Sequence, residues 1–265
     1  MVYHFAVIGN PIEHSLSPQI HQQFARQCNV SLSYEKIEGR NADFENQTLD
    51  FFQHGGWGLN VTLPFKQRAF AMAEVVSERC LRAGAANTLM IKNNTLYADN
   101  TDGIGLIRDL SRVITLQNKN ILILGAGGAT RGIIYPLLDM KPASLTLVNR
   151  TMAKAAQLQT EFPLIKITSF DELHDSFDLI INATSASLEG NAVVVPEAIM
   201  AHQPFCYDLA YSRKELTPFV CYAKTMGCKA ADGLGMLVEQ AAEAFYLWHG
   251  LMPQTEAVLQ RLLNN

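Results

Sequence analysis

The sequence predicts an α/β protein with two domains. Short apolar segments alternate with amphipathic ones through residues 1–103, an apolar segment at 121–124 leads directly into a glycine-rich turn, and strands and helices then alternate. Such alternation is typical of parallel sheets covered by helices. We therefore expect a first α/β domain at 1–103, a doubly wound domain at 104–236, and C-terminal helices at 237–265 that pack back on the first domain.

Each element of the first domain follows from its period and its end signals. Ser17 and Pro18 suit the N-cap and the first position of a helix, because proline lacks the N–H that this position leaves unused. Gly55 and Gly56 favour a helix end. The expected strands are 6–9, 33–37, 58–61, 87–91 and 95–98, and the expected helices are 17–27, 43–52 and 66–76.

The second domain should begin with a helix from Gly103 to Leu116. Pro136 should kink the helix that follows the glycine-rich turn, because it cannot donate a backbone hydrogen bond. The expected strands are 121–124, 144–148, 164–167, 178–184 and 205–210, and the expected helices are 129–140, 151–162, 217–227, 236–250 and 255–265.

Composition limits the classes of function. The chain has 265 residues, 48% of them hydrophobic, and a net charge of −4 without a long basic run, which argues against a nucleic-acid partner. No apolar stretch reaches the roughly 20 residues of a membrane span, and the first residues resemble a strand more than a leader. We expect a soluble, cytoplasmic protein that acts on a small molecule, as a monomer or a homodimer.

Cysteine and histidine patterns give no sign of a disulfide framework or a metal site. The five cysteines form no C-x-x-C pair, which favours reduced thiols. His14 and His21 lack a third ligand at suitable spacing, so we expect no metal.

A dinucleotide site is expected where the apolar strand meets the glycine-rich turn. Gly125, Gly127 and Gly128 permit a tight turn and allow backbone N–H groups to approach a pyrophosphate at a helix N-terminus. The third glycine of the usual pattern is replaced by Thr130, so the context of a strand before and a helix after carries the prediction. A tight turn without a ligand is the alternative.

The end of the next strand favours NADP over NAD. An acidic residue usually binds the adenosine ribose of NAD at this point, but the sequence has Asn149-Arg150-Thr151. The guanidinium of Arg150 suits a 2′-phosphate, and Lys154 one helical turn later could add a second positive charge. A solvated helix end is the alternative for either cation.

A catalytic acid–base pair is expected in the first domain. Lys66 follows the strand at 58–61 through a proline-containing turn, and Asp102 follows the strand at 95–98. If the strands share a sheet edge, the two side chains can meet, and an ammonium beside a carboxylate can exchange a proton with a substrate hydroxyl. Two separate surface charges are the alternative.

Ser15 and Ser17 could bind a substrate carboxylate. Their hydroxyls lie just before the helix expected at 17–27, whose N-terminus also favours an anion. Ser17 could equally serve only as a helix cap.

Beyond these motifs, the chain resembles the shikimate dehydrogenase family. The resemblance rests on stretches in the expected order over nearly the whole chain: GNPIEHSLSPQIH, GLNVTLPFK, GAANTL, DNTDGIG, GAGGATRG, NRT, INATSASLEG, YDLAYSRKELTPF and DGLGMLVEQAAEAFYLWHG. It implies an NADP-binding domain of the Rossmann type, a substrate domain, and the reversible NADPH-dependent reduction of 3-dehydroshikimate to shikimate in the synthesis of aromatic amino acids.

The resemblance also implies roles for individual residues. The substrate would be bound by Ser15, Ser17, Asn60, Thr62, Asn87, Tyr211 and Gln240, with Lys66 and Asp102 as the catalytic pair. The cofactor NADP(H) would be bound by Gly125, Gly127, Gly128, Ala129, Asn149, Arg150, Thr151, Lys154, Thr184, Gly233 and Met236.

The chain departs from the family pattern in a few places. Ala98 and Ser187 each stand where glycine is usual, and Lys154 stands where arginine is common. Two other functions stay open: a quinate/shikimate dehydrogenase that uses NAD, and a non-catalytic module that senses NADP. The first would carry an acid near the adenosine ribose, and the second has no need for Lys66 with Asp102.

Overall fold

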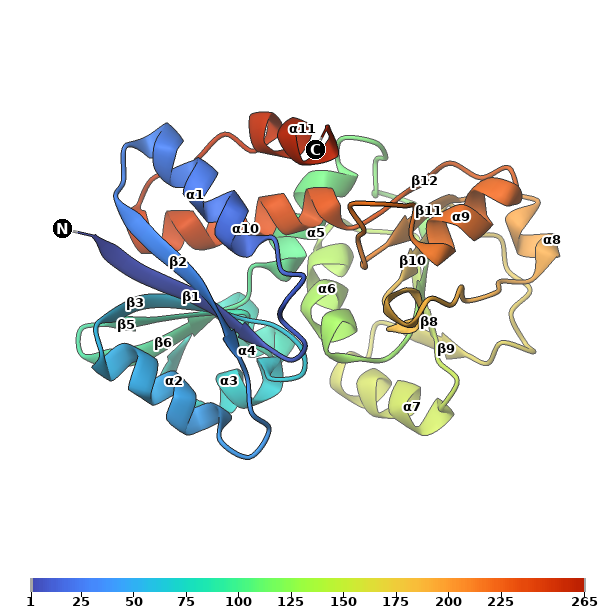
Figure 1. The fold of residues 1–265 in the computed structure, drawn as a ribbon. Helices are drawn as coiled ribbons and strands as arrows, with labels where there is room; N and C mark the ends of the chain where they lie inside the picture. Colours follow the sequence, from blue (N-terminus) through green and yellow to red (C-terminus); the bar gives the residue numbers. More distant parts are fainter. Residues whose placement is uncertain (1, 265) are drawn as a thin grey trace. The chain divides into compact units, whose positions relative to one another are not determined.

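The computed structural model describes residues 2–264 and confirms the predicted α/β fold class (Figure 1). The chain divides into two compact units. Unit 1 comprises residues 2–105 and 237–264, and unit 2 comprises residues 106–236. The C-terminal helices therefore belong to the first unit, as the expected fold class requires.

In the described part of unit 1, the sheet has the strand order β2-β1-β3-β5-β6-β4. β1 pairs in parallel with β2 and β3, whereas β5 is antiparallel to both β3 and β6. Asn93 and Asn94, with φ of 52° and 63°, form the tight turn between β5 and β6. The strands are β1 (Tyr3–Gly9), β2 (Leu32–Glu38), β3 (Gly56–Val61), β4 (Val75–Val76), β5 (Thr88–Lys92) and β6 (Thr95–Asp99).

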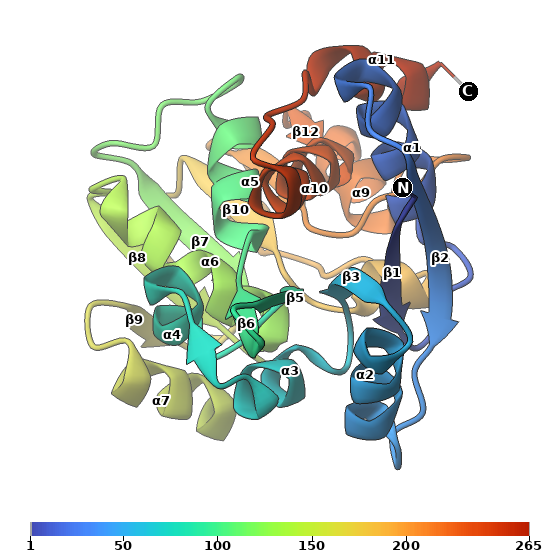
Figure 2. The same cartoon turned by 90° about the vertical axis from the view of Figure 1, so that its left-hand side faces the viewer.

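Helices cover both faces of this sheet, with α1, α10 and α11 on one side and α2 and α3 on the other (Figures 1 and 2). Alternation along β1 divides the core accordingly. Phe5 and Val7 pack in a cluster with Trp248 of α10, and Ala6 and Ile8 pack with the aromatic side chains of α2. The helices of unit 1 are α1 (Ser17–Cys28), α2 (Phe44–Gln53), α3 (Lys66–Met72), α4 (Glu78–Ala83) and α11 (Glu256–Leu263). The boundaries between the units fall within α5 (Asp102–Leu110), which ends in unit 2, and near the start of α10 (Leu234–His249), most of which belongs to unit 1.

The sheet of unit 2 is parallel and has the order β12-β11-β10-β7-β8-β9. The chain moves outward from β7 to β9 and then returns to β10 on the other side of β7, which makes the sheet doubly wound. The strands are β7 (Asn120–Leu124), β8 (Ser144–Val148), β9 (Lys166–Thr168), β10 (Leu179–Asn182), β11 (Phe205–Asp208) and β12 (Ala230–Ala231).

Helices cover both faces of this parallel sheet, so its central strand β7 is apolar and buried from Ile121 to Leu124. Ile121 and Ile123 pack with side chains of α5, α6 and α7, whereas Leu122 and Leu124 pack with those of α8 and α9. The helices are α6 (Gly128–Asp139), α7 (Met152–Glu161), α8 (Glu197–Met200), α9 (Pro218–Thr225) and the 3₁₀ helix η1 (Ala186–Glu189).

Three local expectations are wrong. Ser17 is the first residue of α1 rather than its N-cap, a position that Leu16 occupies. The helix expected at 66–76 ends at Met72, because the β-branched pair at 75–76 forms β4 against β6. The helix expected to reach Leu116 ends at Leu110.

The short helices α4, η1 and α8 were not expected, although the end signals of α4 are present in the sequence. Ser77 accepts a hydrogen bond from the Cys80 backbone N–H at 3.1 Å, and Gly84, with φ of 58°, follows the last helical residue of α4.

None of the helices within residues 2–264 is long and apolar enough to cross a membrane.

His21 of α1 is fully buried among aromatic rings. Its imidazole stacks on Tyr34 with ring centroids 4.5 Å apart and lies 5.3 Å from the ring of Trp248. Burial, with a smaller contribution from the charge of His249, lowers the pKa of His21 from 6.5 to about 3. His21 is therefore neutral in the folded protein at neutral and mildly acidic pH.

We expect this histidine to make the protein less stable as the pH falls from 6.5 towards 3. In that window the unfolded chain binds a proton at His21 and the folded chain does not, so the free energy of unfolding falls by up to about 1.4 kcal/mol per pH unit from this site alone. Urea unfolding at pH 7, 6 and 5 should give a smaller pH slope for His21→Phe than for the unsubstituted protein. His202→Phe, at an exposed site, is the control, and equal slopes for all three proteins would contradict the expectation.

Candidate active site

The carboxyl ends of three strands meet at one edge of the sheet in unit 1. β1 and β3 are parallel, and β6 has the same direction because two antiparallel steps through β5 relate it to β3. The segments that follow these strands carry Ser15, Lys66 and Asp102, and Asn87 directly precedes β5 at the same edge. The topology therefore gathers these polar residues from four segments of the chain.

Lys66 and Asp102 are in direct contact. Lys66 Nζ donates a hydrogen bond to Asp102 Oδ2 at 2.6 Å, and the side chains are only 14% and 8% exposed. Lys66 begins α3 and Asp102 begins α5, where a carboxylate is favoured by the helix dipole. A shielded ammonium of this kind can donate a proton and, once neutral, take one up.

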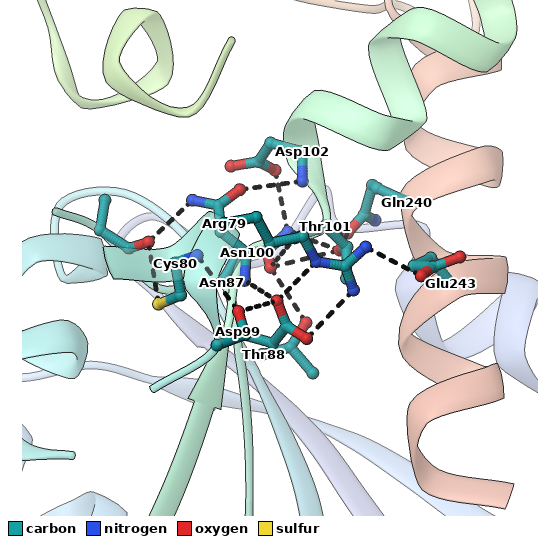
Figure 3. A network of polar contacts seen from close by, with 12 residues as sticks. Arg79, Cys80, Asn87, Thr88, Asp99, Asn100, Thr101, Asp102, Gln240 and Glu243 are labelled. Atoms are coloured by element: carbon teal, nitrogen blue, oxygen red, sulfur yellow. Dashed lines mark hydrogen bonds and ion pairs between the residues drawn. The ribbon is translucent and has the colours of Figure 1, made fainter. Parts of the chain in front are cut away.

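Asn87 is the centre of the polar network around Asp102 (Figure 3). Its Nδ2 donates to Thr101 Oγ1 at 2.9 Å, Asp102 Oδ1 at 2.9 Å and Gln240 Oε1 at 3.2 Å. Its Oδ1 accepts from the Thr101 backbone N–H at 2.8 Å. Lys66 and Asn87 therefore each contact a different oxygen of Asp102, which fixes the orientation of the carboxylate.

A second set of polar groups lies along β3 and the start of α1. Tyr34 Oη donates to Asn60 Oδ1 at 2.6 Å, and burial raises the pKa of Tyr34, so this phenol stays protonated. Ser15 Oγ lies 3.3 Å from Ser17 Oγ and also accepts the backbone N–H of Ser17, the first residue of α1, at 3.3 Å. Thr62 is half-buried directly after β3. These hydroxyl and amide groups suit a small polyhydroxylated acid.

In unit 2, the glycine-rich turn joins β7 to α6 beside the end of β10. Gly125 has φ of 106°, and a Cβ there would press on Thr184 and the Ala183 carbonyl, so a side chain is excluded. A Cβ at Gly127 or Gly128 would meet no atom within 4 Å. Space is therefore open directly over the turn, at the topological switch point between β7 and β10.

The departure from the usual glycine pattern has a local explanation. Thr130 Oγ1 donates to the Gly125 carbonyl at 2.8 Å and is fully buried, so the threonine stabilises the same turn that a third glycine would only permit. Asn149 links this turn to the next strand end. The Ala126 N–H donates to Asn149 Oδ1 at 3.2 Å, and Asn149 Nδ2 donates to the Thr151 carbonyl at 2.8 Å.

The N-termini of α6 and α7 suit an anion. Neither helix has an acidic residue in its first turn or a side chain that caps it, so their first N–H groups lack such an acceptor. Arg150 and Lys154 are both exposed at the start of α7. Within residues 2–264 the guanidinium of Arg150 forms no hydrogen bond or ion pair, so it can bind a phosphate without breaking an existing contact.

The other expected cofactor residues line the segments around the same sheet edge or the start of α10. Ala129 is the second residue of α6, and Thr184 Oγ1 donates to Asn182 Oδ1 at 2.7 Å. A Cβ at Gly233 would clash with the Leu209 carbonyl, and Met236 packs against the core of unit 2. Tyr211, which is expected at the substrate, lies half-buried in unit 2.

Residues that sequence reasoning missed also take part in these networks. Thr101 contacts both Asn87 and Gln240, and its place between Asn100 and Asp102 in a polar motif was the available signal. Asp208, at the end of β11, accepts hydrogen bonds from Asn182, Ser187 and Thr217. Burial raises the pKa of Asp208, although these hydrogen bonds oppose that shift. Ser187, at a position where glycine is usual, thus has a structural role.

Three family profiles match successive parts of the chain. The "Shikimate dehydrogenase substrate binding domain" matches residues 7–89, "Shikimate / quinate 5-dehydrogenase" matches residues 109–213, and the "Shikimate 5'-dehydrogenase C-terminal domain" matches residues 233–263. The matched segments lie in the same order as the elements described above.

Individual proteins match over almost the full length. The chain is 61% identical over 262 residues to "Shikimate dehydrogenase (NADP(+))" of Legionella pneumophila strain Lens, with 99% of each covered. The solved Ael1 enzyme from Pseudomonas putida is 45% identical with a TM-score of 0.91 and 98% of each chain covered. Shikimate 5-dehydrogenase from Thermus thermophilus, solved with NADP(H) and shikimate, is 32% identical with a TM-score of 0.87, and the match covers 98% of this chain and 100% of that one.

Proposed function

Because the chain belongs to the shikimate dehydrogenase family, we propose that it catalyses the reversible NADPH-dependent reduction of 3-dehydroshikimate to shikimate with Lys66 and Asp102 as the acid–base pair. The chain is an NADP-dependent shikimate dehydrogenase by its similarity to curated relatives over nearly its whole length. The observation that carries the catalytic part is the 2.6 Å contact between the two shielded side chains. The product would enter the synthesis of aromatic amino acids.

Reduction of a ketone needs a proton as well as a hydride. NADPH, when bound, supplies the hydride to the carbonyl carbon. Lys66 Nζ donates the proton to the developing alkoxide, and in the reverse direction the neutral amine accepts the proton of the shikimate hydroxyl. Asp102, held by Asn87 on its other oxygen, orients the ammonium and compensates its charge.

The substrate would be bound by groups at the same edge of the sheet in unit 1. We assign its carboxylate to Ser15 and Ser17, whose hydroxyls lie at the N-terminus of α1, where the helix dipole favours an anion. We assign its ring hydroxyls to further amides and hydroxyls, an assignment supported by the burial and the hydrogen bonds of Asn60, Asn87 and Gln240. These residues are Asn60, Thr62, Asn87 and Gln240, together with Tyr211 of unit 2.

The residues of unit 2 fit NADP. The open space over Gly127 and Gly128, with Ala129 following, suits the pyrophosphate at the start of α6. Arg150 suits the 2′-phosphate, with Lys154, Asn149 and Thr151 beside it. We assign the ribose and nicotinamide to the remaining residues Thr184, Gly233 and Met236.

Two alternatives are less well supported. A quinate/shikimate dehydrogenase that uses NAD would need a group that binds the ribose hydroxyls where this chain has the exposed cation Arg150. A non-catalytic NADP sensor would have no use for the shielded ion pair in unit 1. One assay separates the three functions: absorbance of the reduced cofactor with shikimate or quinate, each against NADP or NAD. We expect turnover with shikimate and NADP, whereas quinate with NAD as the best pair, or no turnover, would contradict the proposal.

Replacement of Lys66 should abolish most turnover. We expect Lys66→Ala to lower kcat by roughly 10²- to 10⁴-fold and to change the KM of shikimate much less, because the proton donor acts mainly in the transition state. Steady-state kinetics, with circular dichroism as a check of folding, measure both. Lys92→Ala, at an exposed lysine of β5, is the control, and an unchanged kcat in Lys66→Ala would remove this residue from the mechanism.

Replacement of Arg150 should change the choice of cofactor. We expect Arg150→Ala to weaken NADP binding by roughly 10- to 100-fold, as loss of a charge-assisted hydrogen bond implies, and to leave the weaker binding of NAD unchanged because NAD lacks the 2′-phosphate. Titration of both dinucleotides by protein fluorescence or calorimetry measures the ratio. An equal loss for both would show that Arg150 does not contact the 2′-phosphate.

A further inference from the structure

Arg79 of α4 connects two parts of the proposed active site without contacting either the substrate residues or Lys66. Its Nε donates to Asp99 Oδ1 at 2.7 Å and its Nη2 to Asp99 Oδ2 at 3.0 Å, while Nη1 donates to Glu243 Oε1 at 2.9 Å (Figure 3). One planar guanidinium therefore binds one carboxylate in a bidentate way and a second carboxylate with its remaining nitrogen. Lysine cannot reproduce this geometry.

The first carboxylate controls the segment that carries Asp102. Asp99 ends β6, is 3% exposed, and its Oδ1 also accepts from the Asn100 backbone N–H at 2.6 Å. Asn100 Oδ1 in turn accepts from the Asp102 backbone N–H at 3.1 Å. The Asp99 carbonyl accepts from the backbone N–H of Asn87 at 3.1 Å. Asp99 thus sets the start of α5 and one end of the Asn87 network.

The second carboxylate controls the helix that carries Gln240. Glu243 lies three residues further along α10, so the two side chains project from the same face of the helix. The side chain of Glu243 is 9% exposed. Gln240 Oε1 accepts from Asn87 Nδ2 and from Thr101 Oγ1. The contact of Glu243 with Arg79 therefore fixes the rotation of α10 that presents Gln240 to the network.

The charges explain why this arrangement depends on Arg79. Asp99 and Glu243 are both shielded from water, and each contacts this guanidinium. Without it, both carboxylates would lose a charge-assisted hydrogen-bond donor in a buried site, and they would either move towards water or take up protons. Either response would displace the end of β6 or α10, and with them Asp102 or Gln240.

We propose that Arg79 is a positioning residue, which sets Asp102 for proton transfer through Asp99 and sets Gln240 for substrate binding through Glu243. The inference rests on the proposed function, because it assigns Asp102 and Gln240 their roles. Loss of a positioning residue changes the kinetic constants for the substrate in an enzyme that still folds, and leaves those for the cofactor unchanged. Loss of a purely structural residue lowers stability without this selective change.

The test uses Arg79→Gln, Arg79→Lys and Glu243→Gln in the full chain, assayed with shikimate and NADP below the unfolding temperature of each variant. In Arg79→Gln we expect kcat/KM for shikimate to fall by roughly tenfold or more, through both a lower kcat and a higher KM, with the KM of NADP changed by less than about twofold. Arg79→Lys should recover part of this loss. Glu243→Gln, which leaves the contact between Arg79 and Asp99 intact, should mainly raise the KM of shikimate.

A double-mutant cycle tests whether Glu243 acts through Gln240. The effect of Glu243→Gln on the KM of shikimate should largely disappear when Gln240 is already replaced by alanine, because Glu243 then has no Gln240 side chain to position. If the effects of the two substitutions on KM are additive, Glu243 does not act through Gln240 and this part of the proposal is wrong. If Arg79→Gln does not fold, Arg79→Lys and Glu243→Gln decide the matter with the same kinetic constants.

The control is Arg40→Gln, which removes a surface arginine of unit 1 that is 67% exposed and pairs with Asp43 at 2.5 Å. This variant should behave like the unsubstituted protein. Arg79 variants with a lower melting temperature but unchanged kcat and KM would show a structural role only and overturn the inference while the proposed function stands. An unsubstituted protein without activity on shikimate would overturn both.

Discussion

The orientation of one carboxylate governs the arrangement of polar groups in unit 1. Asp102 offers one oxygen to Lys66 and the other to Asn87, so the ammonium and the amide network are fixed relative to each other. This arrangement requires the ends of β3 and β6 to lie at the same edge, which the antiparallel β5 between them provides. The contact between Lys66 and Asp102 therefore depends on the sheet topology, which sets the positions from which these side chains can meet.

The strands of unit 2 also end at one edge of their sheet, but the polar groups at this edge are of another kind. At the carboxyl ends of these parallel strands, they are mainly backbone N–H groups at helix starts. Gly125 brings the turn close to Ala183 and Thr184, and the open space at Gly127 is left for a ligand. A turn without side chains is suited to a pyrophosphate, whereas the ring hydroxyls of a small acid need the directed side chains found in unit 1.

The parts that could be predicted from the sequence are those in which a short motif coincides with a strand end. The glycine-rich turn follows an apolar strand, and Lys66 follows another, so both could be placed before the structure was known. The contact of Asn87 with Gln240 spans 153 residues and has no local pattern. Residues 75–76 continue an apparent helix in sequence but pair with β6, because a partner strand far along the chain outweighs local propensity.

The order of the elements has a consequence for how the protein is made on the ribosome. Residues 2–105 emerge before unit 2, yet the ring of Phe5 in β1 packs against that of Trp248, 4.7 Å away between centroids, and Trp248 is synthesised only after unit 2. The contiguous segment 106–236 has all its own strands before α10 is complete, so it can fold while the nascent chain is still growing. One face of the sheet in unit 1 therefore stays without its covering helix until α10 has been synthesised.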